Sequence, residues 1–348
     1  GGAEGAAKKL VFNALKNKKH VVTANKALIA KYGDQLAKIA EKNQVNLEYE
    51  AAVCGGVPII RSLKEGLIAN KISKIYGIFN GTSNYILTSM DKQNKSFDEV
   101  LSNAKKLGYA EADPSDDLNG NDVSSKLKIL SSLCFNTFLN HNIYVEGIKD
   151  IDKNDIDNAN KLGYKIKLLG YAELLNSKIN QRVHPTLIKS SSHLAGIDGV
   201  LNAVIVSGKP VGQSSIQGEG AGPSATTSAL VSDISSILRG NIKFPFSLSN
   251  KERKKLKSSN IAERFFSAYL RFEVLDKPGV LSSITNIFSK NKVSIKRLIQ
   301  DPNKGKKSSS IIIITHSSKD VNLNKIVKHI SKKNYIKKKP KLIRIEDD

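Results

Sequence analysis

The 348 residues lack the sequence features of disulfide-rich, metal-binding, membrane-spanning and secreted proteins. The two cysteines, Cys54 and Cys134, lack metal-ligand spacing and are too few for a disulfide framework, which is typical of a reducing compartment. No apolar run approaches the roughly 18 residues that a membrane-spanning helix needs. The opening residues Gly1-Gly2-Ala3-Glu4 do not resemble a signal peptide. These absences predict a cytoplasmic protein with packing cysteines and no membrane partner.

Methionine is almost absent too. The one copy, Met90, is internal, so the chain as written does not begin at an initiator, and we expect it to be processed or a fragment. At about 150 residues per domain, the length predicts two or three domains, each with its own core.

Acidic residues are too few to balance the basic ones, since 55 Lys+Arg against 32 Asp+Glu give a net charge of +23. Most of the excess lies in residues 251–348, which hold 25 basic and 9 acidic residues. Zinc-finger spacing, an aromatic RNA-binding signature and a basic region leading into heptads are all missing. A solvated lysine-rich surface is therefore favoured over a nucleic-acid partner, and binding of an anionic polymer is kept as a rival.

The N-terminal part alternates between helix and strand. Apolar residues at helical spacing near Leu10 precede a β-prone run at 20–23, a helix that starts at Asn25 and a strand from Leu47 to Val53. This alternation predicts part of a parallel α/β sheet. Further on we expect helices over 59–69, 83–91, 97–107, 121–138 and 224–239 and strands over 72–79, 143–147, 178–188 and 201–206.

The C-terminal part has a different order. After a polar, lysine-rich stretch at 247–264, strand and helix patterns follow one another as βαββαβ, which is the ferredoxin-like arrangement. The predicted strands are 267–275, 293–300, 308–316 and 335–346, and the predicted helices are 279–291 and 321–333.

The segment from Lys106 to Lys126 contains the most informative polar residues. Several acids precede a predicted helix, where carboxylates cap unsatisfied amides. Asp122 and Lys126 stand four residues apart, so they share one helix face. Taken alone, this pair is most simply a surface ion pair. A calcium loop is excluded, because Lys128 stands where the closing glutamate is needed.

Resemblance to a known family adds more than composition does. The string YAEADPSDDLNGNDVSSKLKIL at 109–130 resembles the substrate-site signature of homoserine dehydrogenases. Further blocks match in the same order, namely HVVTANKALIA at 20–30, EAAVCGGVPII at 50–60, GIFNGTSNYIL at 77–87 and GEGAGPSATTSAL at 218–230. The string FEVLDKPGVLSSIT at 272–285 resembles an ACT domain, the amino-acid-sensing module of many bacterial members.

The resemblance implies an α/β fold with three parts. These are a partial Rossmann-type nucleotide domain, an α+β catalytic and dimerisation domain and a ferredoxin-like ACT domain. The expected divisions are a nucleotide-domain remnant at 1–52, the catalytic domain at 53–215, a segment returning to the nucleotide domain at 216–246, a linker at 247–264 and the ACT domain at 265–348.

Residue roles follow from the resemblance position by position. Lys126 matches the lysine that exchanges the hydroxyl proton while hydride moves between C4 of homoserine and the nicotinamide. The positions that match substrate-binding residues are Glu111, Asp117, Asp122, Thr82 and Tyr109. Those that match cofactor contacts are Lys26 and Gly222. The matches to a monovalent-cation site for Na⁺ or K⁺, formed largely by backbone oxygens, are Glu50, Val53, Gly55 and Val57. The matches to an effector turn are Asp276, Pro278, Gly279 and Val280.

The implied activity is the NAD(P)-dependent interconversion of L-homoserine and L-aspartate 4-semialdehyde, on the route to threonine and methionine. The family also implies a homodimer or tetramer and feedback by threonine. The rival from another class is a catalytically inactive amino-acid-sensing protein. The first strand and phosphate loop of a dinucleotide fold are not in this sequence, so we expect residues 1–348 alone to bind NAD(P) poorly and to be inactive.

Three interpretations stay open from the residues themselves. Lys26 is equally well read as an ordinary helix-start lysine. The glycines Gly218, Gly220 and Gly222 are more often a loop than a nucleotide cradle. A second cation such as Lys26 would lower the pKa of Lys126 and Asp122 would raise it, so the direction is undecided.

Overall fold

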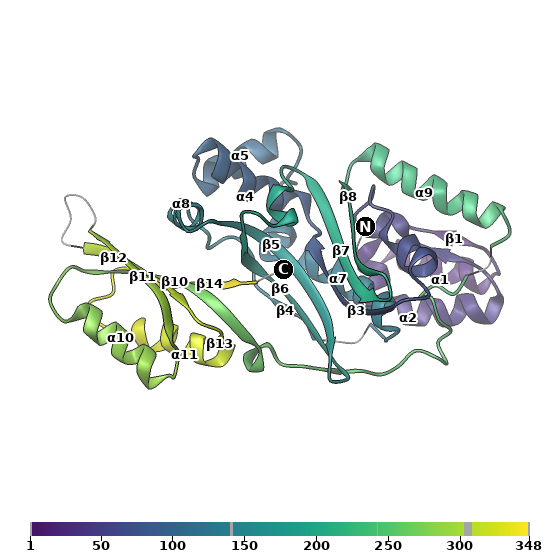
Figure 1. Ribbon diagram of the computed structural model, residues 1–348. Helices are drawn as coiled ribbons and strands as arrows, with labels where there is room; N and C mark the ends of the chain where they lie inside the picture. The colour runs from purple at the N-terminus through teal and green to yellow at the C-terminus, as the bar shows by residue number, and fades with distance from the viewer. Residues whose placement is uncertain (1, 140–141, 242, 303–307, 347–348) are drawn as a thin grey trace. The chain divides into compact units, whose positions relative to one another are not determined.

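The computed structural model describes residues 2–139, 142–241, 243–302 and 308–346 (Figure 1). The chain forms two compact units. Unit 1 consists of Gly1–Lys153, Leu168–His184 and Gly196–Ser259. Unit 2 consists of Asn154–Lys167, Pro185–Ala195 and Asn260–Asp348. The domain divisions expected from the sequence stay predictions.

Unit 1 begins with the expected parallel α/β arrangement. Its first elements are α1 (Ala6–Lys16), β1 (Val21–Val22), α2 (Lys26–Asn43) and β2 (Leu47–Glu48). β1 and β2 pair in parallel, with Val21 opposite Leu47. The Asn25 side chain accepts the N–H of Leu28 at 3.0 Å, so α2 starts with a capped first turn. This cap fixes Lys26 as the first residue of the helix.

A loop joins β2 to a short irregular helix. The elements here are η1 (Glu50–Ala52), α3 (Ile59–Arg61) and the π-helical turn η2 (Ser62–Gly66). The prediction of one regular helix over 59–69 is therefore wrong in detail, since regular α geometry ends at Arg61. The wider π turn allows the Lys64 side chain to be buried against Glu48 at 2.9 Å.

The second half of unit 1 packs helices on an antiparallel sheet. The helices are α4 (Gly81–Gln93), α5 (Phe97–Lys106), α6 (Ser115–Asn119) and α7 (Asn121–Phe135). The strands are β3 (Lys71–Ile78), β5 (Tyr164–Leu175), β6 (Lys178–Lys189), β7 (Leu201–Lys209) and β8 (Gly212–Glu219). Residues 164–167 of β5 and 185–189 of β6 are assigned to unit 2. β3 lies between β5 and β7, and β8 pairs with β7. Buried apolar residues of α7, such as Leu127 and Leu130, form the core beneath this sheet.

Several elements differ from the prediction. α6, β5, β8 and α8 (Lys153–Lys161) were not predicted. β8 is rich in serine, glutamine and glycine and alternates between exposed and half-buried residues, so its sequence lacks the apolar alternation of a strand. α6 has five residues, too few for a periodic signal.

α9 (Pro223–Leu238) returns to the start of the chain. It packs on η1 and on β1, and Figure 1 shows it near the label of β1. The segment after it does not hang free, because Arg253 is buried and its guanidinium pairs with Asp34 at 2.7 Å. Through its contact with η1, α9 packs against the loop after β2, although it lies far from that loop in the sequence.

Unit 2 has the predicted βαββαβ order. Its elements are β10 (Phe265–Leu275), α10 (Val280–Lys290), β11 (Ile295–Pro302), β12 (Ser308–Thr315), β13 (Ser318–Lys319), α11 (Asp320–Ile330) and β14 (Lys341–Ile345). The strands lie in the order β14-β10-β12-β11, with antiparallel neighbours, which is the ferredoxin-like topology. The last strand starts at Lys341 rather than at residue 335, since Pro340 and the lysines before it precede the ladder. Phe272 and Phe288 meet edge to face in the core.

The remaining short elements are β4 (Tyr144–Val145), η3 (His193–Gly196), β9 (Lys257–Ser258) and η4 (Ile261–Glu263). Among the described residues, none of the helices is both long and apolar enough to cross a membrane.

Candidate active site

Asp122 stands between two lysines at the start of α7. Its Oδ2 lies 2.8 Å from Nζ of Lys126, and its Oδ1 lies 2.5 Å from Nζ of Lys26. Asp122 and Lys126 are both buried, so the interpretation of this pair as a surface ion pair is wrong. Gly120, with φ 84°, makes the sharp turn from α6 into α7 that places Asp122 in the first helical turn. Lys26 is the first residue of α2, as one of the two interpretations predicts, and its side chain also pairs with Asp122.

Lys126 has a second partner at the end of β3. Its Nζ donates to the backbone oxygen of Phe79 at 2.7 Å. Burial by itself would lower the pKa of Lys126, but the charge and hydrogen bond of Asp122, together with Cys54 and Asp117, outweigh burial and raise that pKa above its ordinary value. Of the two directions left open by the sequence, these surroundings favour the raised pKa, and so the protonated form of Lys126.

Asn80 links the two acids of the cluster. Its Oδ1 accepts the N–H of Ser83 at 2.8 Å and caps α4. Its Nδ2 donates to Oδ1 of Asp117 at 2.7 Å and to Oδ2 of Asp122 at 2.9 Å. Asn80 belongs to the family-like string at 77–87, but no role was predicted for it from the sequence. Its position between a strand and a helix indicates a cap, whereas its acidic partners lie 37 and 42 residues further along the chain.

The two acids have opposite electrostatic environments. Burial would raise the pKa of Asp122, but Lys126 and Lys26 together lower it below its ordinary value. For Asp117, burial and the charge of Asp122 both raise the pKa, and the amide of Asn80 only partly offsets them. Asp122 is therefore the fixed negative charge of the site, and Asp117 is the acid that takes up a proton more readily.

Thr82 and Tyr109 lie at the edge of this cluster. The Thr82 hydroxyl donates to the backbone oxygen of Tyr109 at 2.6 Å and also lies against the Asp117 carboxylate. The Tyr109 ring is 42% exposed and packs on Tyr85 with centroids 4.9 Å apart. Glu111, two residues beyond Tyr109, is exposed and lies outside the buried group. The structure thus gathers Asp117, Asp122 and Thr82, and leaves Glu111 at the surface.

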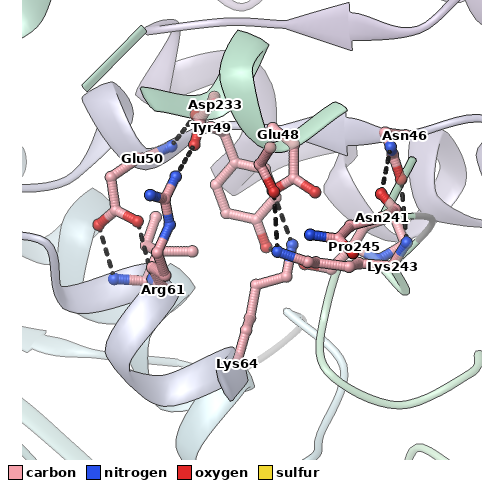
Figure 2. Close-up of polar contacts among 12 residues, drawn as sticks. Asn46, Glu48, Tyr49, Glu50, Arg61, Lys64, Asp233, Asn241, Lys243 and Pro245 are labelled. Atoms are coloured by element: carbon pink, nitrogen blue, oxygen red, sulfur yellow. Dashed lines mark hydrogen bonds and ion pairs between the residues drawn. The ribbon is translucent and has the colours of Figure 1, made fainter. Parts of the chain in front are cut away.

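A closed ring of polar contacts holds the loop after β2 (Figure 2). The Glu50 carboxylate accepts the N–H groups of Ile60 at 2.8 Å and Arg61 at 2.7 Å. The backbone N–H of Glu50 donates to Oδ2 of Asp233 at 2.9 Å, and the Arg61 guanidinium pairs with Oδ1 of the same residue at 3.1 Å. Burial raises the pKa of Glu50 to about 7, although both amide bonds oppose the shift. The ring joins η1, α3 and α9, and so brackets the loop Val53–Pro58.

A second set of contacts anchors the end of β2. The Tyr49 hydroxyl donates to the backbone oxygen of Pro245 at 2.5 Å, and Lys64 pairs with Glu48 (Figure 2). These partners lie up to 196 residues apart, and no local sequence signal pairs them. Asp233 and Arg61 escaped the sequence interpretation for the same reason.

The glycine-rich segment packs directly on this loop. The N–H of Gly56 donates to the backbone oxygen of Glu219 at 2.8 Å. A Cβ atom on Gly56 would lie 2.8 Å from that same oxygen, so a larger residue would force the two backbones apart. Gly218 belongs to β8, so the segment is partly a strand rather than only a loop. Gly222 precedes α9 at φ 114°, with open space around it.

The residues present fit a dinucleotide and an alkali cation. Gly222 stands at the N-terminus of a 16-residue helix, whose unsatisfied N–H groups favour an anion, and the partly exposed Lys26 adds a positive charge. Val53, Gly55 and Val57 are buried, and backbone oxygens such as theirs are donors of the type that hard cations prefer. Within the described residues, no group of three or more His, Cys, Asp or Glu is placed to hold a metal ion.

The four residues of the expected effector turn line one cavity of unit 2. This cavity of about 470 Å³ is bounded by Leu275 to Leu281 together with Gln300 and Ser309. Gly279 has φ 86° and precedes α10, so the turn opens onto the start of that helix.

Comparisons with known proteins agree with this architecture. A family profile described as homoserine dehydrogenase matches residues 58–235. The NAD binding domain of homoserine dehydrogenase matches residues 2–50, and the ACT domain matches residues 268–333. The three matches follow the order of the nucleotide, catalytic and ACT parts.

Relatives extend over nearly the whole chain. A homoserine dehydrogenase of Neisseria gonorrhoeae is 42% identical over 352 residues, which cover 99% of this chain and 81% of the relative. A crystal structure of a homoserine dehydrogenase from Thiobacillus denitrificans is 40% identical with a TM-score of 0.91, covering 98% of this chain and 79% of the other. A hyperthermophilic archaeal homoserine dehydrogenase mutant in complex with NADPH is 30% identical with a TM-score of 0.60, covering 68% and 69%.

Proposed function

Because the chain belongs to the homoserine dehydrogenase family, we propose how its residues divide the NAD(P)-dependent interconversion of L-homoserine and L-aspartate 4-semialdehyde. The observation that carries the proposal is the buried sequence of contacts Lys26–Asp122–Lys126. Oxidation of homoserine breaks one C4–H bond, whose hydride goes to the nicotinamide, and one O–H bond, whose proton goes to a base.

Lys126 exchanges that proton. With a raised pKa it is protonated at neutral pH, and it is then ready to donate a proton to the alkoxide that forms when the semialdehyde is reduced. In the direction of oxidation Lys126 must first lose its proton before it can accept the one from the homoserine hydroxyl. Its bonds to Asp122 and Phe79 hold Nζ in place for both directions.

Asp117 and Asp122 bind the amino group of homoserine, at the end of the substrate away from the hydroxyl. Homoserine carries a cationic amino group, and the pair Asp117 and Asp122 is the complementary host for it. Asn80 holds both carboxylates in place. Thr82 and Tyr109, joined by a hydrogen bond, contribute at the edge of the site, and the exposed Glu111 is kept as a substrate contact on its family match alone.

Lys26 and Gly222 bind the nicotinamide cofactor, which supplies the hydride acceptor when bound. Gly222 leaves room for close approach to the start of α9, and Lys26 brings a positive charge to Asp122. The archaeal relative in complex with NADPH supports a nicotinamide cofactor for this chain.

A monovalent cation occupies the loop of Glu50, Val53, Gly55 and Val57. Cys54, at φ 54°, reverses the chain between two of these residues. Because the Glu50 carboxylate is already bound by two backbone N–H groups, the backbone oxygens provide most of the coordination.

The ACT domain binds an amino-acid effector in the cavity at Asp276, Pro278, Gly279 and Val280, and the assembly is a homodimer or tetramer. Threonine is the effector to test first. The alternative of a catalytically inactive sensor has no support in the comparisons, and the intact Lys126–Asp122 pair argues against it.

The test compares three forms of the full-length protein by the absorbance of NAD(P)H. Lys126→Ala is expected to lower kcat in both directions by about 10²- to 10⁴-fold, because the proton exchange is lost. Lys106→Ala, which removes an exposed lysine at the end of α5, is the matched control and should keep wild-type turnover. Near-normal turnover by Lys126→Ala would overturn the assignment.

A further inference from the structure

A cavity of about 410 Å³ opens where both helices of unit 2 end. It is lined by Ile287, Lys290, Asn291, His329, Lys332 and Lys333. α10 ends at Lys290 and α11 at Ile330, so the lining comes from the last turn of each helix and the residues just beyond it. It shares no residue with the cavity at Asp276 to Val280.

Every charged side chain in this lining is basic. Lys290, Lys332 and Lys333 are exposed, and His329 adds an imidazole N–H. Within the described part of unit 2, no hydrogen bond or ion pair engages the side chains of these four residues. Lys319 of the same unit behaves differently, since it pairs with Glu263 at 2.8 Å.

Helix dipoles account for only part of this arrangement. The C-terminus of a helix carries about −0.5 of an elementary charge, and a lysine placed there is stabilised. Two helix ends therefore offset about one positive charge. Three ammonium groups line the cavity, so roughly two charges remain unbalanced. Like charges gathered around one cavity repel one another, and an anion bound among them relieves that repulsion.

We propose that this cavity binds a small anion with two or more negative charges, of the phosphate class. Three ammonium groups and the imidazole N–H are donors from both sides, and Ile287 offers an apolar wall for the rest of a phosphorylated metabolite. The volume is within the range of about 300–1,000 Å³ that is usual for small-molecule sites. A nucleic-acid duplex, which presents a charge every ~1.7 Å along its axis, needs an extended basic track instead.

Calorimetric titration of the full-length protein with inorganic pyrophosphate at low ionic strength tests the site. We expect saturable binding that the double variant Lys332→Gln/Lys333→Gln weakens by at least about tenfold, because each charge-assisted hydrogen bond is worth about 1.5–3 kcal/mol. The matched control is Lys337→Gln/Lys338→Gln, which removes the same charge from exposed lysines of unit 2 outside the cavity. The control should retain the affinity within about twofold, a difference well under the 1.4 kcal/mol of a tenfold change.

Lys290 lines the cavity from the end of α10, so Lys290→Gln is an independent test of the same site. It should also weaken pyrophosphate binding, and its thermal unfolding should match that of the wild type because the side chain is exposed. Equal weakening by the cavity and control variants would show that only net charge matters, and the proposal would fail. Unsaturable binding, or no change in either variant, would overturn it as well. A 20-base-pair duplex that binds at the cavity lysines more tightly than pyrophosphate would identify a polymer site and overturn the small-anion assignment.

Discussion

Lys26 and Asp122 come from opposite parts of unit 1, yet Nζ of Lys26 lies 2.5 Å from Oδ1 of Asp122. The other oxygen of the same carboxylate holds Lys126. One carboxylate thus stands between two ammonium groups, and Asp117, bridged to it by the Asn80 amide, adds a second carboxylate to the cluster. The Asp122 carboxylate therefore links the start of α2 to the first turns of α7, and it holds the ammonium group that we propose as the proton donor to a developing alkoxide.

The pH dependence of turnover should differ between the two directions. Because the pKa of Lys126 is raised, the lysine keeps its proton through neutral and mildly alkaline pH. Semialdehyde reduction, which needs the protonated form, should hold its kcat across that range. Homoserine oxidation, which needs the neutral form, should increase in kcat as the pH rises and reach no plateau near neutrality. A pH–rate profile for oxidation that levels off near pH 7 would contradict this.

Asp122→Asn should shift that profile towards lower pH. The substitution removes the charge that holds the pKa of Lys126 up, and burial then prevails and lowers it. We expect the pH at which the rate of oxidation rises to be lower by at least about one pH unit, and the KM for homoserine to be higher. Asp116→Asn, at an exposed position of the same segment, is the control and should leave that pH unchanged. An unchanged pH in Asp122→Asn would mean that another group titrates.

Asn80→Ala should separate a cap effect from a site effect. The variant loses the N-cap of α4, which costs about 0.5–2 kcal/mol of unfolding free energy, and also the donor to Asp117 and Asp122. Ser96→Ala removes the exposed N-cap of α5 at a similar cost and touches no site residue. Urea unfolding should show a loss in both variants, the larger one in Asn80→Ala because two buried carboxylates also lose a donor, whereas only Asn80→Ala should lower kcat. Equal activities in the two variants would reduce Asn80 to a structural cap.

Much of unit 2 could be read from the sequence because its signals are local. Apolar periodicity over α10 and α11 and the β-branched run in β12 indicate their elements without reference to distant residues. The pair Asp122 and Lys126 was equally visible, since a four-residue spacing places both on one helix face. Its burial was not visible, because the covering residues come from α2 and the end of β3.

The parts that escaped prediction depend on contacts over long separations. Asp233 binds the backbone of Glu50 across 183 residues, and nothing in either segment marks the other as its partner. The strand β8 owes its pairing to β7 rather than to its own polar sequence. In both cases tertiary structure decides the role of a residue whose local pattern is neutral.

Glu50 should make the stability of unit 1 depend on pH in an uncommon direction. In the folded protein its pKa is about 7, whereas an unfolded glutamate titrates near 4.3. Between these values the folded state holds a proton that the unfolded chain has released, so raising the pH favours unfolding. The contribution of Glu50 is fully present below about pH 4 and is lost progressively as the pH rises through the folded pKa, by up to roughly 3–4 kcal/mol.

Glu50→Gln does not titrate, and it should therefore flatten this decline. The expected measurement is the free energy of urea unfolding at pH 5.5 and pH 8, with a larger difference between the two in the wild type than in the variant. Glutamine also offers only one acceptor oxygen to the N–H groups of Ile60 and Arg61, so the variant should be less stable than the wild type at pH 5.5. Glu65→Gln, at a glutamate of η2 that pairs with Lys243, is the control and should keep the wild-type decline. If Glu50→Gln retains the full decline, the Glu50 carboxylate is not its source. Glu50 would then stay ionised in the folded protein at both pH values.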